Sequence, residues 1–272
     1  MIICNDFVML NYPKTGSSFV RKVIKDIFKR RSSDNLLKKL AYEINISRPY
    51  KELILPNFQD PNPRIRHLVG QHGAYCQVPK EYIDRTIVSV IRNPYERFLS
   101  GYLYRWWADN PSLSQDELDE HFPNFPNLNL DDYIKYQQLS SEDSELDLGS
   151  QTIQFIRMFF KDPKRVLYNI TEDYIKSDSA YQQDMPKILF LKQENLNNEL
   201  SNFLSTKEFS REEVEFAKNY EKTNVTKDRG QDKNSIWTKE AIEHLERSEQ
   251  LLFTILKNIG YDCKRPESNP SI

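Results

Sequence analysis

The spacing of apolar positions along this chain changes several times from a continuous run to a three- and four-residue repeat. Each such change predicts a strand followed by a helix. Residues 6–12 contain the apolar run Phe7 to Leu10, which is typical of a buried parallel strand. Residues 17–31 then place apolar side chains three and four positions apart, with lysines and arginines opposite, which predicts an amphipathic helix. Residues 86–91 are rich in β-branched side chains and form the clearest predicted strand.

The same patterns predict the remaining elements. We expect further strands at residues 65–69, 166–170 and 188–191. Strands that alternate with helices indicate an α/β fold: a three-layer domain with a mainly parallel central sheet flanked by helices. The last helix is predicted to bury Ile259 and to end at Gly260. Helices are expected directly after Asn93 and at residues 36–44, 151–160, 196–204 and 238–258.

The chain is long enough for one large domain or two, and we predict a single domain over residues 1–272. Residues 108–150 are acidic and carry several prolines and asparagines. We therefore expect a loop-rich insertion there that could act as a lid. Residues 264–272 are expected to form a disordered tail.

Charge and composition narrow the class of protein. Charged residues make up 29% and hydrophobic residues 38% of the chain, as in a globular protein. The net charge of −2 argues against a general nucleic-acid binder, because such proteins carry a basic surplus. Any functional cations must therefore be local.

Cysteine usage and hydropathy point to a cytoplasmic protein. Cys4, Cys76 and Cys263 are odd in number and widely spaced, which fits neither a disulfide framework nor a zinc site. No run approaches the roughly 20 apolar residues of a membrane span. The chain enters its first predicted strand almost at once, so we expect no signal peptide.

The segment 12–18, with the sequence Tyr-Pro-Lys-Thr-Gly-Ser-Ser, lies between a predicted strand and a predicted helix. A helix N-terminus offers unpaired N–H groups and a partial positive charge, so it favours an anion. Gly16 allows close backbone approach, Ser17 and Ser18 add hydroxyl donors, and Lys14 adds a full charge. An ATP-binding loop would carry its lysine after a second glycine, whereas Lys14 precedes Gly16, so this is not an ordinary ATP-binding P-loop.

A second segment, residues 92–102, has the sequence Arg-Asn-Pro-Tyr-Glu-Arg-Phe-Leu-Ser-Gly-Tyr and directly follows the predicted strand 86–91. Asn93 is expected to cap the next helix, with Pro94 as its first residue. One strand–turn–helix site can hold one phosphate-like group. Two such sites suggest a ligand with anionic groups at both ends.

Together these segments resemble sulfotransferases that use 3′-phosphoadenosine 5′-phosphosulfate (PAPS), and the Arg-Asn-Pro-Tyr core is most similar to the bacterial and Golgi carbohydrate branch. The resemblance implies a P-loop-like fold, a PAPS donor, adenosine 3′,5′-bisphosphate (PAP) as product, and no metal. The 5′-phosphosulfate would be bound by the loop, and the 3′-phosphate by Arg92 and Ser100. Residues 227–234 lie where the family often has a basic loop that closes over the nucleotide, in which Arg229 or Lys233 would contact the 3′-phosphate; the alternative is a solvated charged loop. The loop ligands implied are Pro13, Lys14, Thr15, Gly16, Ser17 and Ser18.

Sulfuryl transfer to a hydroxyl benefits from a general base, and His72 is the best candidate. It follows the predicted strand 65–69, and the carboxyl ends of parallel strands border the ligand crevice. The carbohydrate branch commonly has its base after this strand. The alternatives are that His72 is structural or orients substrate, or that a carboxylate acts instead. Lys14 would stabilise the leaving phosphate, and the resemblance implies a hydroxyl acceptor, expected to be a saccharide.

Two other hypotheses remain open. A nucleotide-dependent phosphotransferase would share the strand–loop–helix scaffold, but a clear magnesium-binding Ser/Thr and aspartate pair is lacking. A non-catalytic nucleotide-binding protein would keep the fold without a base, whereas His72 argues for catalysis. The sequence does not predict the identity of the acceptor or the oligomeric state.

Overall fold

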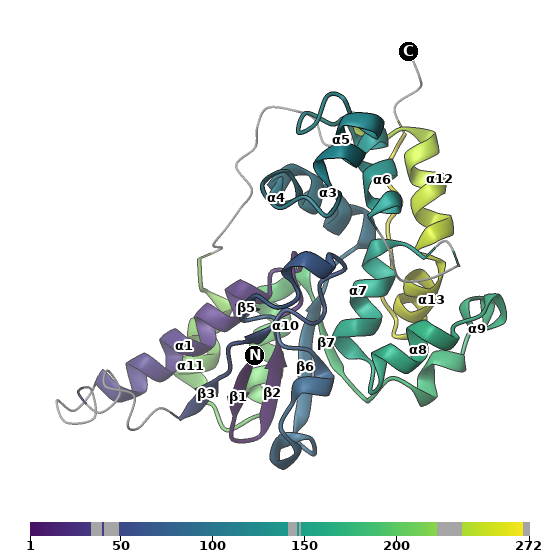
Figure 1. Ribbon diagram of the computed structural model, residues 1–272. Helices are drawn as coiled ribbons and strands as arrows, with labels where there is room; N and C mark the ends of the chain where they lie inside the picture. Colours follow the sequence, from purple (N-terminus) through teal and green to yellow (C-terminus); the bar gives the residue numbers. More distant parts are fainter. Residues whose placement is uncertain (34–39, 41–48, 141–145, 147, 222–235, 269–272) are drawn as a thin grey trace. The chain divides into compact units, whose positions relative to one another are not determined.

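The computed structural model describes residues 1–33, 40, 49–140, 146, 148–221 and 236–268 (Figure 1). Its internal contacts divide the chain into two compact units. Unit 1 comprises residues 1–56, 69–92 and 187–225, and unit 2 comprises residues 57–68, 93–186 and 226–272, each over its described part. Each unit is treated below by itself.

Unit 1 is built on a five-stranded sheet in the order β3-β1-β2-β6-β7. β2 pairs parallel with β6, and β6 pairs parallel with β7, whereas β1 is antiparallel to both β2 and β3. Four strands therefore run the same way, and the predicted α/β class with a mainly parallel sheet is confirmed. The strands are β1 (Ile2–Cys4), β2 (Phe7–Leu10), β3 (Tyr50–Glu52), β6 (Thr86–Ile91) and β7 (Leu189–Lys192).

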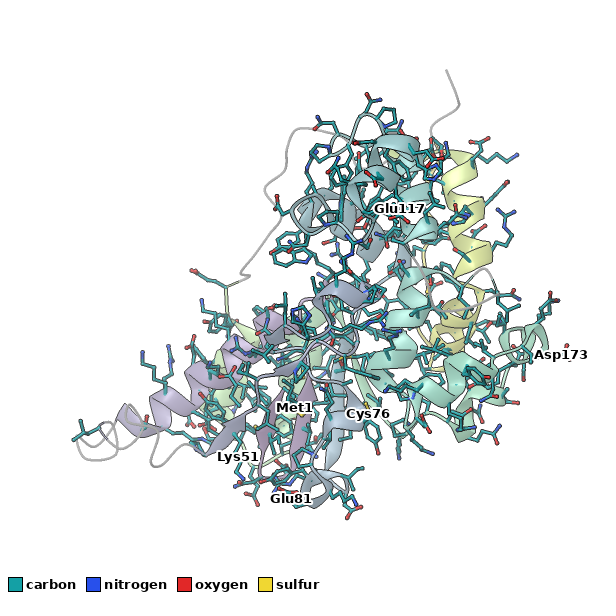
Figure 2. All side chains as sticks on the ribbon, viewed as in Figure 1. Met1, Lys51, Cys76, Glu81, Glu117 and Asp173 are labelled. Atoms are coloured by element: carbon teal, nitrogen blue, oxygen red, sulfur yellow. The ribbon has the colours of Figure 1, made fainter. Side chains whose placement is uncertain are left out.

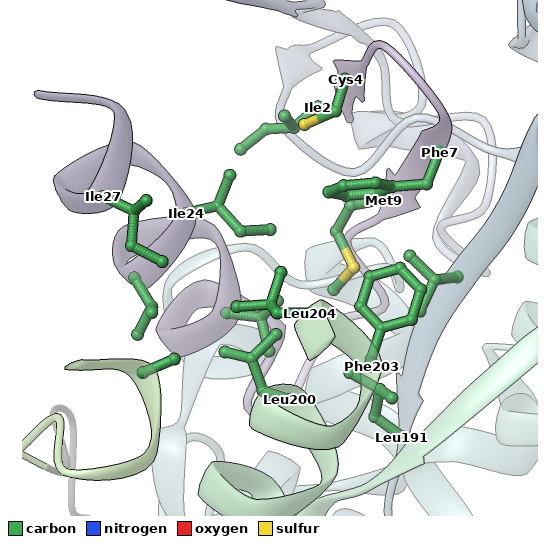
Figure 3. Close-up of a cluster of buried hydrophobic side chains, with 14 of the residues drawn as sticks. Ile2, Cys4, Phe7, Met9, Ile24, Ile27, Leu191, Leu200, Phe203 and Leu204 are labelled. Atoms are coloured by element: carbon green, nitrogen blue, oxygen red, sulfur yellow. The ribbon is translucent and has the colours of Figure 1, made fainter. Parts of the chain in front are cut away.

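Three helices cover one face of this sheet: α1 (Ser17–Ser33), α10 (Leu196–Ser205) and α11 (Arg211–Lys218). In Figure 3, Ile24 and Ile27 of α1 lie opposite Leu200 and Leu204 of α10, with side chains of β1 and β2 beside them. All four residues of β2 are buried, which explains its unbroken apolar sequence. The hydrophobic core of unit 1 therefore fixes the end of β2, the start of α1 and the end of β6.

Several predicted elements are confirmed with shifts of a few residues. The expected strands at 6–12, 86–91 and 188–191 are β2, β6 and β7. The expected helices at 17–31 and 196–204 are α1 and α10, and the one at 151–160 is α7 (Ser150–Phe159) of unit 2. The predicted helix at 36–44 falls outside the described residues except at Leu40.

The predicted strand at 65–69 is wrong. Asn62 accepts a hydrogen bond from the N–H of Arg64 and Pro63 follows it, so this segment begins as the 3-10 turn η1 (Pro63–Ile65) of unit 2. Strand character returns only in β5 (Val69–Gly70), which pairs antiparallel with β4 (Leu55–Pro56) in a separate two-stranded sheet of unit 1. The short turns η2 (Tyr75–Gln77) and η3 (Lys80–Tyr82) then lead to β6, and η5 (Gln193–Asn195) links β7 to α10.

The predicted strand at 166–170 is also wrong, because the segment forms helix α8 (Pro163–Asn169) of unit 2. Asp162 caps this helix by accepting from the N–H of Arg165, and Pro163 takes its first position. The buried residues Pro163, Val166 and Leu167 are three and four apart, which is the helical spacing. Unit 2 continues with α9 (Glu172–Lys176) and η4 (Ala180–Gln183).

The long helix predicted at 238–258 is two helices, α12 (Lys239–Ser248) and α13 (Gln250–Asn258), which meet at Glu249. Ile259, expected to be buried, is 38% exposed. Gly260 ends α13 as predicted, with φ +75° and the N–H of Tyr261 bonded to the carbonyl of Leu256. The tail is held at its start, since the Lys264 carbonyl accepts from Asn93 Nδ2 at 2.7 Å. For the rest of residues 264–272, disorder stays a prediction.

Helices occupy much of the segment that the sequence predicts to be a loop-rich insertion. Within residues 108–150 lie α5 (Gln115–His121) and α6 (Leu130–Leu139), capped by Ser114 and Asn129. They pack with α3 (Pro94–Tyr104) and α4 (Trp106–Asp109) in an aromatic core that includes Trp107, so the loop-rich expectation is wrong for these stretches. A lid role for 108–150 stays a prediction. In the described residues, no helix is both long and apolar enough to span a membrane.

Candidate active site

The loop between β2 and α1 has a sharply turned backbone. Lys14 has φ +64° and Gly16 has φ +87°, both in the left-handed region. This region suits glycine, whereas a residue with a Cβ pays roughly 1–2 kcal/mol to adopt it. A Cβ at Gly16 would also lie 3.1 Å from Leu196 Cδ2. Glycine is therefore required at position 16, and the lysine is held in a strained conformation of the kind that clusters at functional sites.

Two of the hydroxyl groups in this loop stabilise the loop itself. Thr15 Oγ1 and Ser17 Oγ both donate to the carbonyl of Tyr12, at 2.8 and 2.7 Å, and both side chains are buried. Their protons are therefore already used within the loop. Ser18 differs, because its side chain is half-buried and its Oγ accepts from Gln71 Nε2 at 3.5 Å.

The first turn of α1 has the features of an anion site. The first N–H groups of any helix have no carbonyl one turn earlier to bond with. Phe19 N–H donates to the carbonyl of Gly16 at 2.9 Å, so Ser17 and Ser18 are the helix residues whose N–H groups suit an anion. Lys14 lies in the turn immediately before them.

Arg92 connects the second motif to this loop. It directly follows β6, the parallel neighbour of β2, and its Nη1 donates to the carbonyl of Lys14 at 3.4 Å. Ser89 Oγ also donates to the carbonyl of Leu10 at 2.8 Å, which ties the two strand ends together. The structure therefore brings together two segments that the sequence separates widely.

Two other predicted ligands are not placed beside the loop by these contacts. Ser100 lies two turns into α3, in unit 2, with a half-buried side chain, and its pairing with Arg92 stays a prediction. Arg229 and Lys233, with the predicted closing loop at 227–234, lie outside the described residues.

His72 lies against the end of β2 although it does not follow a strand of the main sheet. Its Nδ1 is 2.7 Å from the carbonyl oxygen of Asn11. A carbonyl oxygen can only accept, so Nδ1 carries the proton and Nε2 keeps its lone pair. Burial lowers the pKa of His72 below its ordinary value of 6.5, with smaller lowering effects from the Met1 amine and Arg21. A neutral imidazole with a basic Nε2 can accept a proton.

The residues around His72 are tightly held. The carbonyl of Gln71 accepts from the amine of Met1 at 2.8 Å and from Asn11 Nδ2 at 3.2 Å. Met1, which is labelled in Figure 2, belongs to unit 1. A Cβ at Gly73 would lie 2.7 Å from Met1 Cε and 2.8 Å from Leu55 Cδ1, so the chain passes these side chains too closely for any larger residue. The position of His72 is therefore determined by its neighbours on both sides.

The other candidates from the sequence have structural or surface positions. His67 is exposed, not in a strand, and His121 is exposed at the end of α5. His244 Nδ1 lies 3.3 Å from Gln138 Nε2 in unit 2. Arg97 is buried and donates to the side-chain oxygens of Gln151 and Gln154, which is a structural role.

Asn11 and Gln71 are the residues of this site that sequence reasoning missed. Asn11 is a polar residue at the end of an apolar strand, directly before the loop, and Gln71 precedes the candidate base. Those positions were the available signals. Their contacts with His72 and Ser18 depend on a long-range approach that no local pattern encodes.

The loop, Arg92 and His72 all lie within the part of the chain that matches a known family. Residues 4–246 match the model of the sulfotransferase domain. The chain belongs to the sulfotransferase family. No curated protein and no solved structure matches it significantly.

A sulfotransferase moves a sulfuryl group to a hydroxyl-bearing acceptor, and the family generally uses PAPS as donor. The residues of unit 1 fit such a donor. The turn at Gly16 brings backbone N–H groups to the start of α1, Lys14 lies in this turn, and the Arg92 guanidinium contacts the Lys14 carbonyl. Over the described ranges, no group of three or more His, Cys, Asp or Glu side chains could hold a metal ion.

Proposed function

We propose that this sulfotransferase transfers the sulfuryl group of PAPS to an acceptor hydroxyl, with His72 as general base and Lys14 stabilising the leaving phosphate. The observation that supports this most is one connected arrangement in unit 1. The helix N-terminus at Ser17 follows Lys14, and the neutral imidazole of His72 is bonded to Asn11, three residues before that lysine. The candidate anion site and the candidate base are thus both attached to the segment that ends β2.

The donor would be bound at two ends. Pro13, Lys14, Thr15, Gly16, Ser17 and Ser18 would hold the 5′-phosphosulfate, through backbone N–H groups and the Ser18 hydroxyl. Arg92, with Ser100 and Arg229, would hold the 3′-phosphate, as the resemblance implies. When bound, PAPS supplies an activated sulfuryl group on a phosphate that leaves as PAP. No metal is required in this proposal, because the cationic side chains and the helix N-terminus supply positive charge.

The protein residues would then act on protons and charge. His72 Nε2 would accept the proton of the acceptor hydroxyl, while Nδ1–H keeps its bond to the carbonyl of Asn11. The resulting imidazolium would keep its hydrogen bond to Asn11, and its positive charge would favour the negative charge that develops on the acceptor oxygen. Lys14 would offset the negative charge that develops on the leaving phosphate, which is the charge stabilisation that most favours group transfer of this type.

We further propose that the acceptor is a saccharide and that the protein acts in the cytoplasm. The Arg-Asn-Pro-Tyr segment that starts at Arg92 and the histidine after β5 support the carbohydrate branch. The three free cysteines, Cys4, Cys76 and Cys263, support a reducing compartment. Residues 108–150 would serve as the lid.

The test is a calorimetric titration with PAP, and separately with ADP and ATP, without magnesium. Micromolar binding selective for PAP is the expected result, since only PAP carries a 3′-phosphate. The Arg92→Ala variant should weaken PAP binding far more than ADP binding, by about 10-fold or more for a lost charged hydrogen bond. Magnesium-dependent preference for ATP would instead favour a phosphotransferase. No binding to any of the three would favour a non-catalytic scaffold.

A further inference from the structure

Asn11 contacts both residues of the segment that carries the candidate base. It lies directly after β2 and is fully buried. Its backbone carbonyl accepts from His72 Nδ1 at 2.7 Å, and its side-chain Nδ2 donates to the carbonyl of Gln71 at 3.2 Å. One residue at the start of the phosphosulfate loop therefore holds two successive residues of another loop.

The orientation of the Asn11 amide follows from its partner. The carbonyl of Gln71 can only accept, so Nδ2 must face it, and a flipped amide would place two oxygens against each other. Asn11 Oδ1 is then buried and has no hydrogen-bond partner in the described part of the chain. An unsatisfied buried acceptor costs stability, so an apolar side chain of similar volume would suit this position better for folding alone.

The surroundings of His72 leave its tautomer dependent on Asn11. Two groups act electrostatically on the imidazole, the Met1 amine and Arg21 of α1, and neither is a carboxylate that would hold a proton on the ring. Arg21 is itself bonded to Glu52, at 2.7 Å from its Nε. Over the described ranges, the ring of His72 has its hydrogen bond with the carbonyl of Asn11 and with no other group.

We propose that Asn11 is the positioning residue of the base: its side chain clamps the Gln71 carbonyl so that its own carbonyl keeps His72 in the Nδ1–H tautomer. This inference depends on the proposed role of His72. If the clamp is lost, the imidazole is free to adopt the Nε2–H form, in which Nε2 can no longer accept the acceptor proton. Asn11 then sets the fraction of His72 that is competent as a base.

The experiment compares Asn11→Leu and Asn11→Asp with the wild type by nitrogen NMR of ¹⁵N-labelled histidine, with His72→Gln to assign the signal. The wild type should show His72 protonated at Nδ1. Asn11→Leu should shift the signal toward a mixture of tautomers while its unfolding temperature stays equal or rises. Asn11→Asp keeps the side-chain shape but replaces the N–H donor with a carboxylate oxygen, so it should also shift His72 away from the Nδ1–H tautomer. The added negative charge should raise the pKa of His72.

Kinetics add a second readout and a matched control. Asn11→Leu should lower kcat about tenfold or more, with the KM for PAPS and the affinity for PAP within about twofold, because the base and not the donor site is affected. Asn57 also has a buried Oδ1 without a partner in the described residues, but in unit 2. Asn57→Leu should leave the tautomer of His72 and kcat unchanged.

The outcomes separate this inference from the proposed function. An unchanged Nδ1–H signal in both Asn11 variants would overturn the positioning role, whatever the activity. If the Asn11 variants shift the tautomer but the wild type does not transfer sulfuryl groups, the positioning role of Asn11 is supported and the role of His72 as a sulfotransferase base is rejected. Should Asn11→Leu fail to fold, Asn11→Ala decides on the same NMR signal, because it removes the amide donor without adding bulk or a buried charge.

Discussion

Lys14 combines a strained backbone with a positive charge at the candidate site. Its left-handed backbone is unusual for a residue with a side chain, and the neighbouring hydroxyls of Thr15 and Ser17 hold the loop in that form. The sequence was sufficient to choose Lys14, because its place before Gly16 is recognisable. The sequence was not sufficient to show that the hydroxyl groups of Thr15 and Ser17 donate to the carbonyl of Tyr12.

The Lys14→Ala variant should lower kcat by about 10²–10³, the loss typical of removing one charge-stabilising group, while the protein stays folded. Steady-state kinetics with saturating PAPS and circular dichroism would measure the two properties. Lys29→Ala, which removes an exposed cation elsewhere on α1, is the matched control and should keep wild-type turnover. Wild-type turnover in Lys14→Ala would remove this lysine from the mechanism.

At the scale of elements, strands buried in the sheet were predictable and short irregular ones were not. The apolar runs of β2 and β6 were sufficient to predict these strands. Two other apolar stretches were predicted to be strands but form helical segments, because Asn62 and Asp162 cap them. The division of α12 from α13 was equally hidden, because the pattern of buried leucines continues through it. Glu249, the residue between the two helices, makes a tertiary contact that the local sequence does not predict.

Glu249 caps α7 from a distant part of the chain. Its carboxylate accepts from the N–H of Gln151 at 3.0 Å and from the N–H and hydroxyl of Thr152, both at 2.6 Å. Gly149, the N-cap residue, leaves room for it, since a Cβ there would come within 2.2 Å of the carboxylate.

Glu249→Ala should therefore lower the free energy of unfolding by about 3 kcal/mol, because it leaves buried donors unsatisfied. Urea denaturation would measure this loss. Glu243→Ala on the exposed side of α12 should change it by less than about 0.5 kcal/mol. A loss below about 1 kcal/mol for Glu249→Ala would mean that water replaces the cap.

The same carboxylate gives a pH dependence with a definite sign. Burial raises the pKa of Glu249 above its ordinary value of 4.5, despite the hydrogen bonds that oppose this. The folded protein therefore binds a proton more tightly than the unfolded chain, and stability from this group is lost as pH rises above that value. Relative to Glu249→Gln, the wild type should be less stable at neutral pH than near pH 4.5 in the same urea experiment.

At the scale of the whole molecule, the net charge of −2 gives no hint that Arg92 lies against the loop that carries Lys14. The α/β class and the mainly parallel sheet followed from alternating patterns, but the division into two compact units did not, because it depends on contacts between segments far apart in sequence. The single domain over 1–272 stays a prediction. From the sequence, only the family resemblance indicates that Arg92 and Lys14 belong to one site. In the structure, the parallel pairing of β2 with β6 brings the Arg92 guanidinium to the Lys14 carbonyl.

If Lys14 and Arg92 supply the positive charge that magnesium supplies in phosphotransferases, as we propose, activity should be independent of metal. Dialysis against EDTA should leave the rate of sulfuryl transfer within about twofold of the untreated enzyme, and added magnesium should not raise it. The control is a magnesium-dependent kinase treated in parallel. Loss of activity that magnesium restores would contradict the proposed chemistry.

The two hydroxyl bonds to the carbonyl of Tyr12 also bear on how fast a donor is captured. Thr15 and Ser17 are buried and bonded within the loop itself, so the loop holds its shape without help from a ligand. The conformational entropy of ordering the turn is then lost during folding and not during binding. Donor association would need no slow rearrangement of residues 12–18, and encounter of the anion with the preformed cradle would set its rate.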